Sequence, residues 1–302
     1  MNNKNIQHDK KNIDKHLKEL EQLLDSFLSQ AVLSNENGIN VSNQERIGTL
    51  LSLVCRYKEQ IKSVRILLRN GQVPDATSIA RDSFELYVQI AYILKERELI
   101  EEKLKFYREF QLLKSNLEIL EIHGDCAESE EKVREDSEDN ANDDIKRYLT
   151  GSKQKKMILK KSWYEVYEKF KTNKERVTLK DLTKTAFNYD NKKDDELEEL
   201  WIKSLYLLGY GYASRISHSS LVREKVGINN MSGNIFIDKR PSLENASIPL
   251  MLVTLDTLEL IKLLSRNNDM ILLQKSLLSP ELETKIMVNA EKIRSDLEKY
   301  KS

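Results

Sequence analysis

The sequence predicts an all-α fold, a bundle of several helices with at most a tiny β element. Glycine and proline occur only 9 and 4 times in 302 residues, which disfavours a turn-rich β fold. Apolar residues recur at intervals of three and four along most of the chain, the spacing of amphipathic helices. One charge-rich segment, residues 125–161, interrupts this pattern. We expect one helical domain over residues 1–302, with that segment as an insertion within it.

Four amphipathic segments predict the first four helices. Residues 9–34 carry a stripe of large apolar side chains, and Ser42 with Glu45 has capping-box spacing at the start of the second helix. Gly71 is placed to end that helix, and Pro74 to open the third. The third segment is apolar on much of its circumference, so we expect it near the middle of the bundle. The four expected helices span residues 9–34, 42–69, 74–96 and 98–122.

The insertion consists of two blocks of opposite charge. Residues 125–144 contain ten acidic and two basic residues, whereas residues 145–161 contain seven basic residues and no acidic one. The acidic block has almost no large apolar side chain, which is typical of a solvated or disordered linker. Charge runs are usually solvated faces, but the basic block also offers a face for a partner. Both interpretations stay open.

Further helices are expected after the insertion. A short helix follows Trp163, Thr178 is placed to cap residues 179–186, and residues 194–219 form a longer helix. The alternating piece around Phe236 predicts a short strand or an extended arm. Helices resume over residues 243–265, and Ser279 followed by Pro280 has the cap and first-turn proline of a last helix.

Charge and cysteine content exclude several classes of protein. The 49 basic and 49 acidic residues balance, so no global charge draws the chain to nucleic acid or to an anionic membrane. The two cysteines lack metal-ligand spacing, and Cys55 is expected to be a buried small hydrophobe. His8, His16 and His123 lie far apart and are expected on the surface. Because there is no signal-peptide core and no membrane-length apolar run, we expect a cytoplasmic protein. Because metal-ligand spacing and phosphate-binding glycine motifs are missing, we expect no metal or cofactor.

Two polar stripes point to a candidate site. Tyr210, Ser214 and His218 recur every four residues, which places them on one side of a helix. Arg81 and Glu85 lie one turn apart in the apolar third helix, where charges are costly to bury unless paired. If the two helices touch, Glu85 orients His218 while Arg81 faces an anionic group through its planar fork of donors. A polar network that fixes helix register without any chemistry explains the same residues.

Motifs in two parts of the chain occur in a definite order. The first block is a glycine, then alanine-arginine, then a glutamate before an apolar helix; the second is a tryptophan, a lysine-aspartate-leucine helix and a tyrosine-serine-histidine-serine pattern. The matching residues are Gly71, Ala80, Arg81, Glu85, Trp163, Lys180, Asp181, Leu182, Tyr210, Ser214, His218 and Ser220. This order, over roughly residues 42–264, resembles the bacterial family called domain of unknown function 5677. The acidic insertion departs from the family pattern.

The resemblance implies an all-helical fold without a settled biochemical activity. It also implies a distant similarity to the helical HEPN-type proteins of prokaryotes, which include RNA-cleaving toxins and phage-defence proteins. Those ribonucleases carry an arginine and a histidine that stand further apart than Arg215 and His218, between which only Ile216 and Ser217 lie. The departure leaves that catalytic motif unsupported here.

Three functions therefore remain open. The first is a phage-defence or stress-associated protein that binds RNA or an anionic small ligand at the polar centre. The residues expected there are Arg81, Glu85, Tyr210, Ser214, Arg215, His218 and Ser220. The second is a metal-independent endoribonuclease, with His218 as general acid or base and Arg215 or Arg81 stabilising the phosphorane. The third is a non-catalytic scaffold whose first helix joins a second copy or a partner protein, although the same apolar stripe can equally cover its own bundle.

Overall fold

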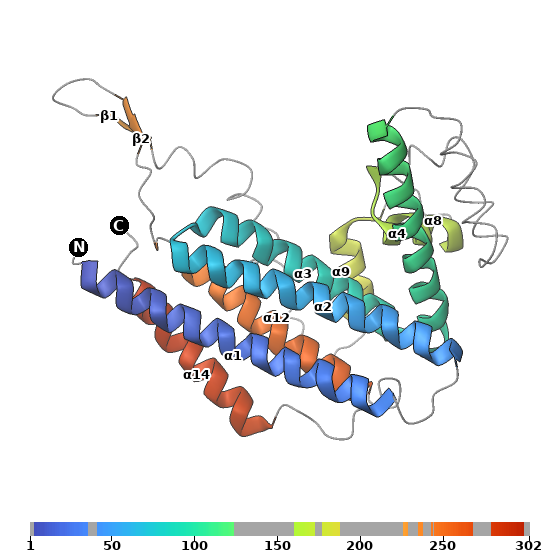
Figure 1. Ribbon diagram of the computed structural model, residues 1–302, viewed down its shortest axis with the longest axis horizontal. Helices are drawn as coiled ribbons and strands as arrows, with labels where there is room; N and C mark the ends of the chain where they lie inside the picture. Colours follow the sequence, from blue (N-terminus) through green and yellow to red (C-terminus); the bar gives the residue numbers. More distant parts are fainter. Residues whose placement is uncertain are drawn as a thin grey trace. The chain divides into compact units, whose positions relative to one another are not determined.

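The computed structural model describes residues 3–35, 41–123, 160–172, 177–187, 226–228, 235–237, 243, 245–267 and 279–298. Eight α-helices and one two-stranded sheet lie within these ranges, which confirms the predicted all-α class (Figure 1). The helices are α1 (Asn3–Asn35), α2 (Val41–Asn70), α3 (Val73–Lys95), α4 (Ile100–His123), α8 (Trp163–Thr172), α9 (Leu179–Phe187), α12 (Ser247–Arg266) and α14 (Pro280–Leu297). A 3-10 turn, η1 (Arg97–Leu99), precedes α4.

The sheet is the small β element that the sequence allows. Strands β1 (Val226–Ile228) and β2 (Ile235–Ile237) pair antiparallel, with Val226 opposite Ile237. The expected strand around Phe236 is therefore confirmed. The expected helix over residues 194–219 and almost all of the charged insertion lie outside the described residues.

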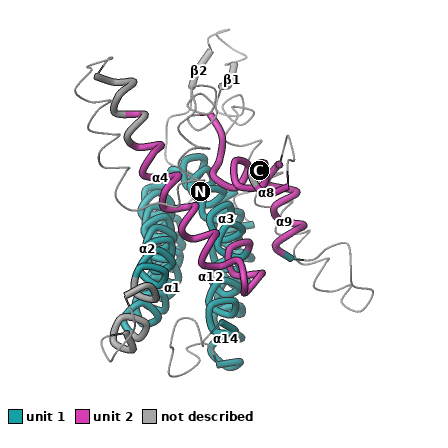
Figure 2. The backbone as a smooth tube through the Cα atoms, turned by 90° about the vertical axis from the view of Figure 1, so that its right-hand side faces the viewer, with its two compact units in different colours: residues 1–91, 187–302 teal, residues 92–186 magenta. Residues whose placement is uncertain are grey.

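The chain divides into two compact units, which Figure 2 shows in different colours. Unit 1 comprises residues 1–91 and 187–302, and unit 2 comprises residues 92–186. Helix α3 crosses this boundary, because Ala91 belongs to unit 1 and Tyr92 to unit 2. That residues 1–302 form a single domain stays a prediction.

Helix α1 packs against three other helices of unit 1. It lies along α2 and also contacts α12 and α14, while α12 packs along α14 (Figure 1). The apolar stripe of α1 is fully buried in this bundle: Ile13, Leu17, Leu20, Leu24 and Phe27. Burying a side chain of this size stabilises the fold by about 2 kcal/mol. The stripe thus covers the chain's own bundle, and a homodimer or partner complex stays a prediction.

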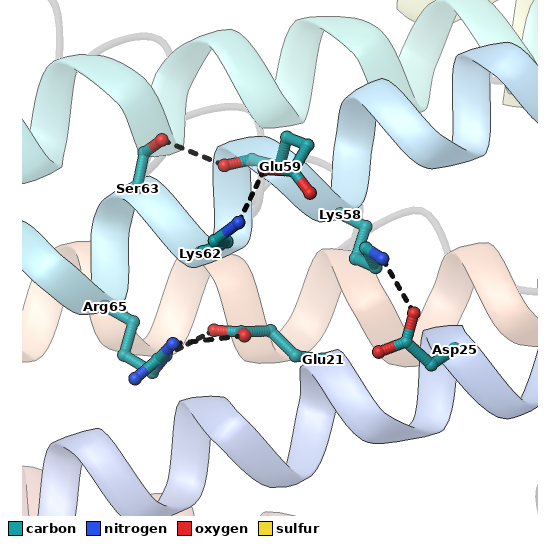
Figure 3. A network of polar contacts seen from close by, with 7 residues as sticks. All are labelled: Glu21, Asp25, Lys58, Glu59, Lys62, Ser63 and Arg65. Carbon is teal, nitrogen blue, oxygen red and sulfur yellow. Dashed lines mark hydrogen bonds and ion pairs between the residues drawn. The ribbon is translucent and has the colours of Figure 1, made fainter.

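Ion pairs tie α1 to α2 along the outside of this packing (Figure 3). Arg65 of α2 donates to both carboxylate oxygens of Glu21 and, at 2.9 Å, to Asp14, so one guanidinium joins two carboxylates of α1. Hydrogen bonding to Glu21 is the main cause that raises the pKa of Arg65. Lys58 pairs with Asp25 at 2.7 Å one turn further along. These pairs fix the register of the two helices.

Three helix ends follow from local sequence. Gly71 has φ of 74°, and the amides of Gly71 and Gln72 donate to Leu68 and Leu67, the hydrogen bonds of a Schellman motif. At the start of α9 the Thr178 hydroxyl accepts from the Asp181 amide, while the Asp181 carboxylate accepts from the Thr178 amide. The Ser279 hydroxyl accepts from the amide of Leu282 at the start of α14. All three predicted signals are confirmed.

Unit 2 has an aromatic core around Trp163, which is 2% exposed. Helix α4 packs on α8, and the rings of Phe106 and Tyr167 meet edge to face with centroids 5.2 Å apart. Lys103 is buried in this core, where its Nζ donates to the Tyr92 carbonyl at 3.0 Å and lies 4.1 Å from the Tyr92 ring. Burial lowers the pKa of Lys103, although Glu96, 3.3 Å away, opposes that shift.

Two expectations about α1 and α2 are wrong. Cys55 is exposed, because the buried face of α2 passes through Val54 and Tyr57 and turns the intervening position outward. His16 is fully buried, because it lies one turn from both Ile13 and Leu20 on the apolar stripe of α1. The second of these errors matters for the candidate site.

Candidate functional site

Arg81 and Glu85 lie where the sequence places them, one turn apart on α3. Both side chains are half-buried, while Ala80 and Phe84 beside them are fully buried. The Nε atom of Arg81 has lost contact with solvent, so the guanidinium is partly desolvated. Arg81 and Arg56 of α2 both lower the pKa of the Asp82 carboxyl, which burial raises more strongly. Two arginines from two helices therefore act on the same small region of unit 1.

The other predicted site residues lie outside the described residues. They are Tyr210, Ser214, Arg215, His218 and Ser220. Their approach to Arg81 and Glu85 therefore stays a prediction.

A different polar cluster occupies the middle of unit 1, around His16. The ring Nε2 of His16 lies 2.9 Å from the Thr254 hydroxyl of α12, and its Nδ1 lies 3.2 Å from the Asn289 amide nitrogen of α14. The Thr254 hydroxyl donates its only proton to the carbonyl of Leu250, at 2.8 Å. Thr254 can therefore only accept from His16, which assigns the proton to Nε2 and leaves Nδ1 as the acceptor of an Asn289 N–H. The chain of donors runs in one direction, from α14 through α1 into α12.

Burial keeps this histidine neutral. Desolvation lowers the pKa of His16 from 6.5 to about 4, because a charged imidazolium is disfavoured in the apolar interior. Both ring nitrogens are already used in hydrogen bonds. His16 is thus suited to positioning Asn289 rather than to exchanging protons with a substrate.

Asp256 is a second unusual group on α12. The side chain is fully buried, and neither carboxylate oxygen has a hydrogen-bond partner. Burial, and secondarily Glu259, raises the pKa of Asp256 well above its usual range, because the ionised carboxylate is disfavoured in the apolar interior. Nearby, the Tyr57 hydroxyl lies 3.2 Å from that of Thr257, and burial together with Asp256 raises the pKa of Tyr57.

Sequence signals for these groups exist. His16 keeps the spacing of the α1 stripe, and Asp256 is the only acid between Met251 and Leu258 in an otherwise apolar and threonine-containing run. A polar residue at a core position of a strongly apolar helix is the signal that identifies both. Asn289 carries no comparable signal, because its role depends on meeting His16 from a distant part of the chain.

A groove between α1 and α14 adjoins the His16 cluster. Its volume is about 820 Å³, and Asn289 lies on its wall. The other lining residues are Lys15, Glu19, Pro280, Glu281, Thr284, Lys285, Val288 and Lys292. The groove is therefore bordered by three ammonium groups and reaches the amide that His16 holds.

The described residues contain neither a ligand cluster that could hold a metal ion nor a helix that could cross a membrane. No group of three histidine, cysteine, aspartate or glutamate side chains there is arranged to hold a metal ion. None of the helices within the described ranges is long and apolar enough to cross a membrane.

Comparison with known proteins leads to one family. No curated protein and no solved structure matches the chain. The family of unknown function DUF5677 matches residues 48–230, which is more than half of the chain and includes Arg81, Glu85 and the tyrosine-serine-histidine pattern. The chain belongs to the DUF5677 family.

Proposed function

We propose that this DUF5677 protein binds a phosphate-bearing ligand, with RNA as the leading candidate, through Arg81. The observation that carries the proposal is the half-burial of Arg81 and Glu85, which lie one turn apart on α3 beside the fully buried Ala80 and Phe84. A guanidinium that has lost part of its water binds an anion more strongly than an exposed one, because the local dielectric constant is lower.

The remaining members of the site are proposed from the sequence. Glu85 would orient His218, while Tyr210, Ser214, Arg215 and Ser220 would complete the binding surface. The family match spans both motifs, which supports treating them together. A role in phage defence or stress, and a distant likeness to HEPN-type proteins, belong to the same proposal.

The binding experiment uses a short fluorescent single-stranded RNA and fluorescence anisotropy. Arg81→Gln should weaken binding by about tenfold or more, because a charge-assisted hydrogen bond to phosphate is lost. The matched control is Arg69→Gln, which removes an exposed arginine from the last turn of α2 and should weaken binding less than about twofold. Equal losses in the two variants would show that RNA is held by general surface charge instead.

The same RNA distinguishes a ribonuclease from a protein that only binds RNA. Incubation with wild-type protein and His218→Gln, without added metal, followed by gel electrophoresis, reports cleavage directly. Cleavage by the wild type alone would make His218 a catalytic residue, whereas intact RNA that still binds through Arg81 supports a binding protein. RNA that neither binds nor is cleaved would refute the RNA proposal and leave the scaffold, for which light scattering would report the oligomeric state.

A further inference from the structure

The groove between α1 and α14 has a charge pattern unlike the rest of α14. Lys285 and Lys292 of α14 and Lys15 of α1 border it, and the structure gives none of the three an ion pair within the described ranges. Other charged residues of α14 do have ion pairs: Glu283 pairs with Lys262 of α12, and Arg294 pairs with Glu291 and with Glu298 just after the helix. The three ammonium groups are thus available to a molecule in the groove.

The carboxylates in the groove do not cancel this charge. Glu281 lies at the first turn of α14, where hydrogen bonds to its own backbone and to Ser279 lower the pKa of its carboxyl. Glu19 is half-buried, one turn from Lys15 on α1. Three ammonium groups against these two carboxylates leave an excess of positive charge in the groove.

The groove also has one hydrogen-bonding group whose orientation is fixed from behind. Because Thr254 donates to Leu250, His16 carries its proton on Nε2 and holds the amide nitrogen of Asn289 at Nδ1. One Asn289 N–H is used in this way, so the second N–H and the carbonyl oxygen are left for other partners. Such an amide is pre-organised, which lowers the ordering cost of binding a ligand.

We propose that this groove is a binding site for a small polyanion, held by Lys15, Lys285 and Lys292 and by the fixed amide of Asn289. The ligand carries several oxyanion groups, phosphate or carboxylate, since ammonium groups bind both as point charges. A groove of about 820 Å³ is within the usual size range of small-molecule sites. We treat the site as separate from the proposed Arg81 site, because neither Arg81 nor Glu85 lines the groove.

Isothermal titration calorimetry with inorganic tripolyphosphate and with citrate tests the proposal on the full chain. The double variant Lys285→Gln/Lys292→Gln should bind the better probe about tenfold more weakly, or worse, than the wild type. The matched control is Lys11→Gln/Lys18→Gln, which removes two exposed lysines of α1 at the same spacing and should change binding less than about twofold. Tighter binding of tripolyphosphate than of citrate would assign a phosphorylated ligand, and the reverse a polycarboxylate.

Two results would overturn the site. Equal losses in the two double variants would mean that binding follows total charge rather than this groove, and binding of neither probe at millimolar concentration would remove the site altogether. The loss of probe binding caused by Lys285→Gln/Lys292→Gln should be the same in a protein that also carries Arg81→Gln, because independent sites give additive effects. The outcome is thereby independent of the test for RNA binding.

Discussion

Buried neutral His16 should make the protein lose stability in mild acid in a way that a single substitution removes. The side chain is fully buried, and its pKa falls from 6.5 to about 4. As the pH drops below 6.5, His16 becomes protonated in the unfolded chain but stays neutral in the folded protein. The free energy of unfolding therefore decreases as the pH is lowered from 6.5, until the folded protein is also protonated at His16 near pH 4.

The size of the effect follows from the two pKa values. Each pH unit between them costs about 1.4 kcal/mol. Between pH 7 and pH 5 the expected loss from His16 is about 2 kcal/mol, because most of that interval lies below the unfolded pKa and above the folded one.

The measurement is urea unfolding followed by circular dichroism at pH 7, 6 and 5, on the wild type and His16→Gln. Glutamine keeps an amide N–H for Thr254 but cannot take up a proton in this range. Other titrating groups act equally in both proteins, so the difference between the two curves isolates His16. The control Gln22→Asn changes an exposed side chain of the same helix that has no ionisable group, and it should follow the wild type.

The reasoning would be refuted if the free energy of unfolding changed with pH in the same way in the wild type and in His16→Gln. If the wild type and His16→Gln lose the same free energy of unfolding between pH 7 and pH 5, within about 0.5 kcal/mol, then His16 is not held neutral in the folded state. The one-directional chain from Asn289 to Leu250 would then be wrong as well.

Two further predictions concern ionisable side chains of unit 1. Asp256→Asn should raise the free energy of unfolding by about 1–3 kcal/mol at pH 7, and the gain should grow in denaturant titrations as the pH rises above the ordinary carboxyl pKa. The reason is that burial raises the pKa of Asp256, so the unfolded chain alone ionises there as the pH rises. Arg65→Met should lower stability by about 2 kcal/mol, since it leaves half-buried Glu21 without its partner, whereas Lys62→Met should cost less than about 0.5 kcal/mol in thermal unfolding.

The helices could be predicted because their signals are local. Apolar spacing located α1, and Gly71, Thr178 and Ser279 located three helix ends, each through hydrogen bonds to residues within five positions. Cys55 was misplaced because a cysteine beside Val54 fits an apolar pattern even when the helix turns it outward.

The His16 cluster was harder to predict because it depends on hydrogen bonds between residues far apart in the sequence. His16 meets Thr254 and Asn289, each more than two hundred positions away in the chain. We expected His16 on the surface and overlooked its place on the apolar stripe of α1, and nothing near it in the sequence identifies its partners. Arg81 and Glu85 were recognised through their spacing on one helix, and their half-burial follows from the apolar residues around them.

The Thr254 hydroxyl of α12 also determines how the Asn289 carboxamide of α14 is oriented, because His16 lies between them. Valine has nearly the same shape, but it would leave the imidazole Nε2–H without an acceptor in the interior. The tautomer with the proton on Nδ1 would then be favoured, and the Asn289 carboxamide would rotate so that its carbonyl oxygen accepts this N–H. Exchanging one oxygen for one methyl deep in α12 would thus invert which atoms α14 shows to its surroundings, without altering a single surface residue.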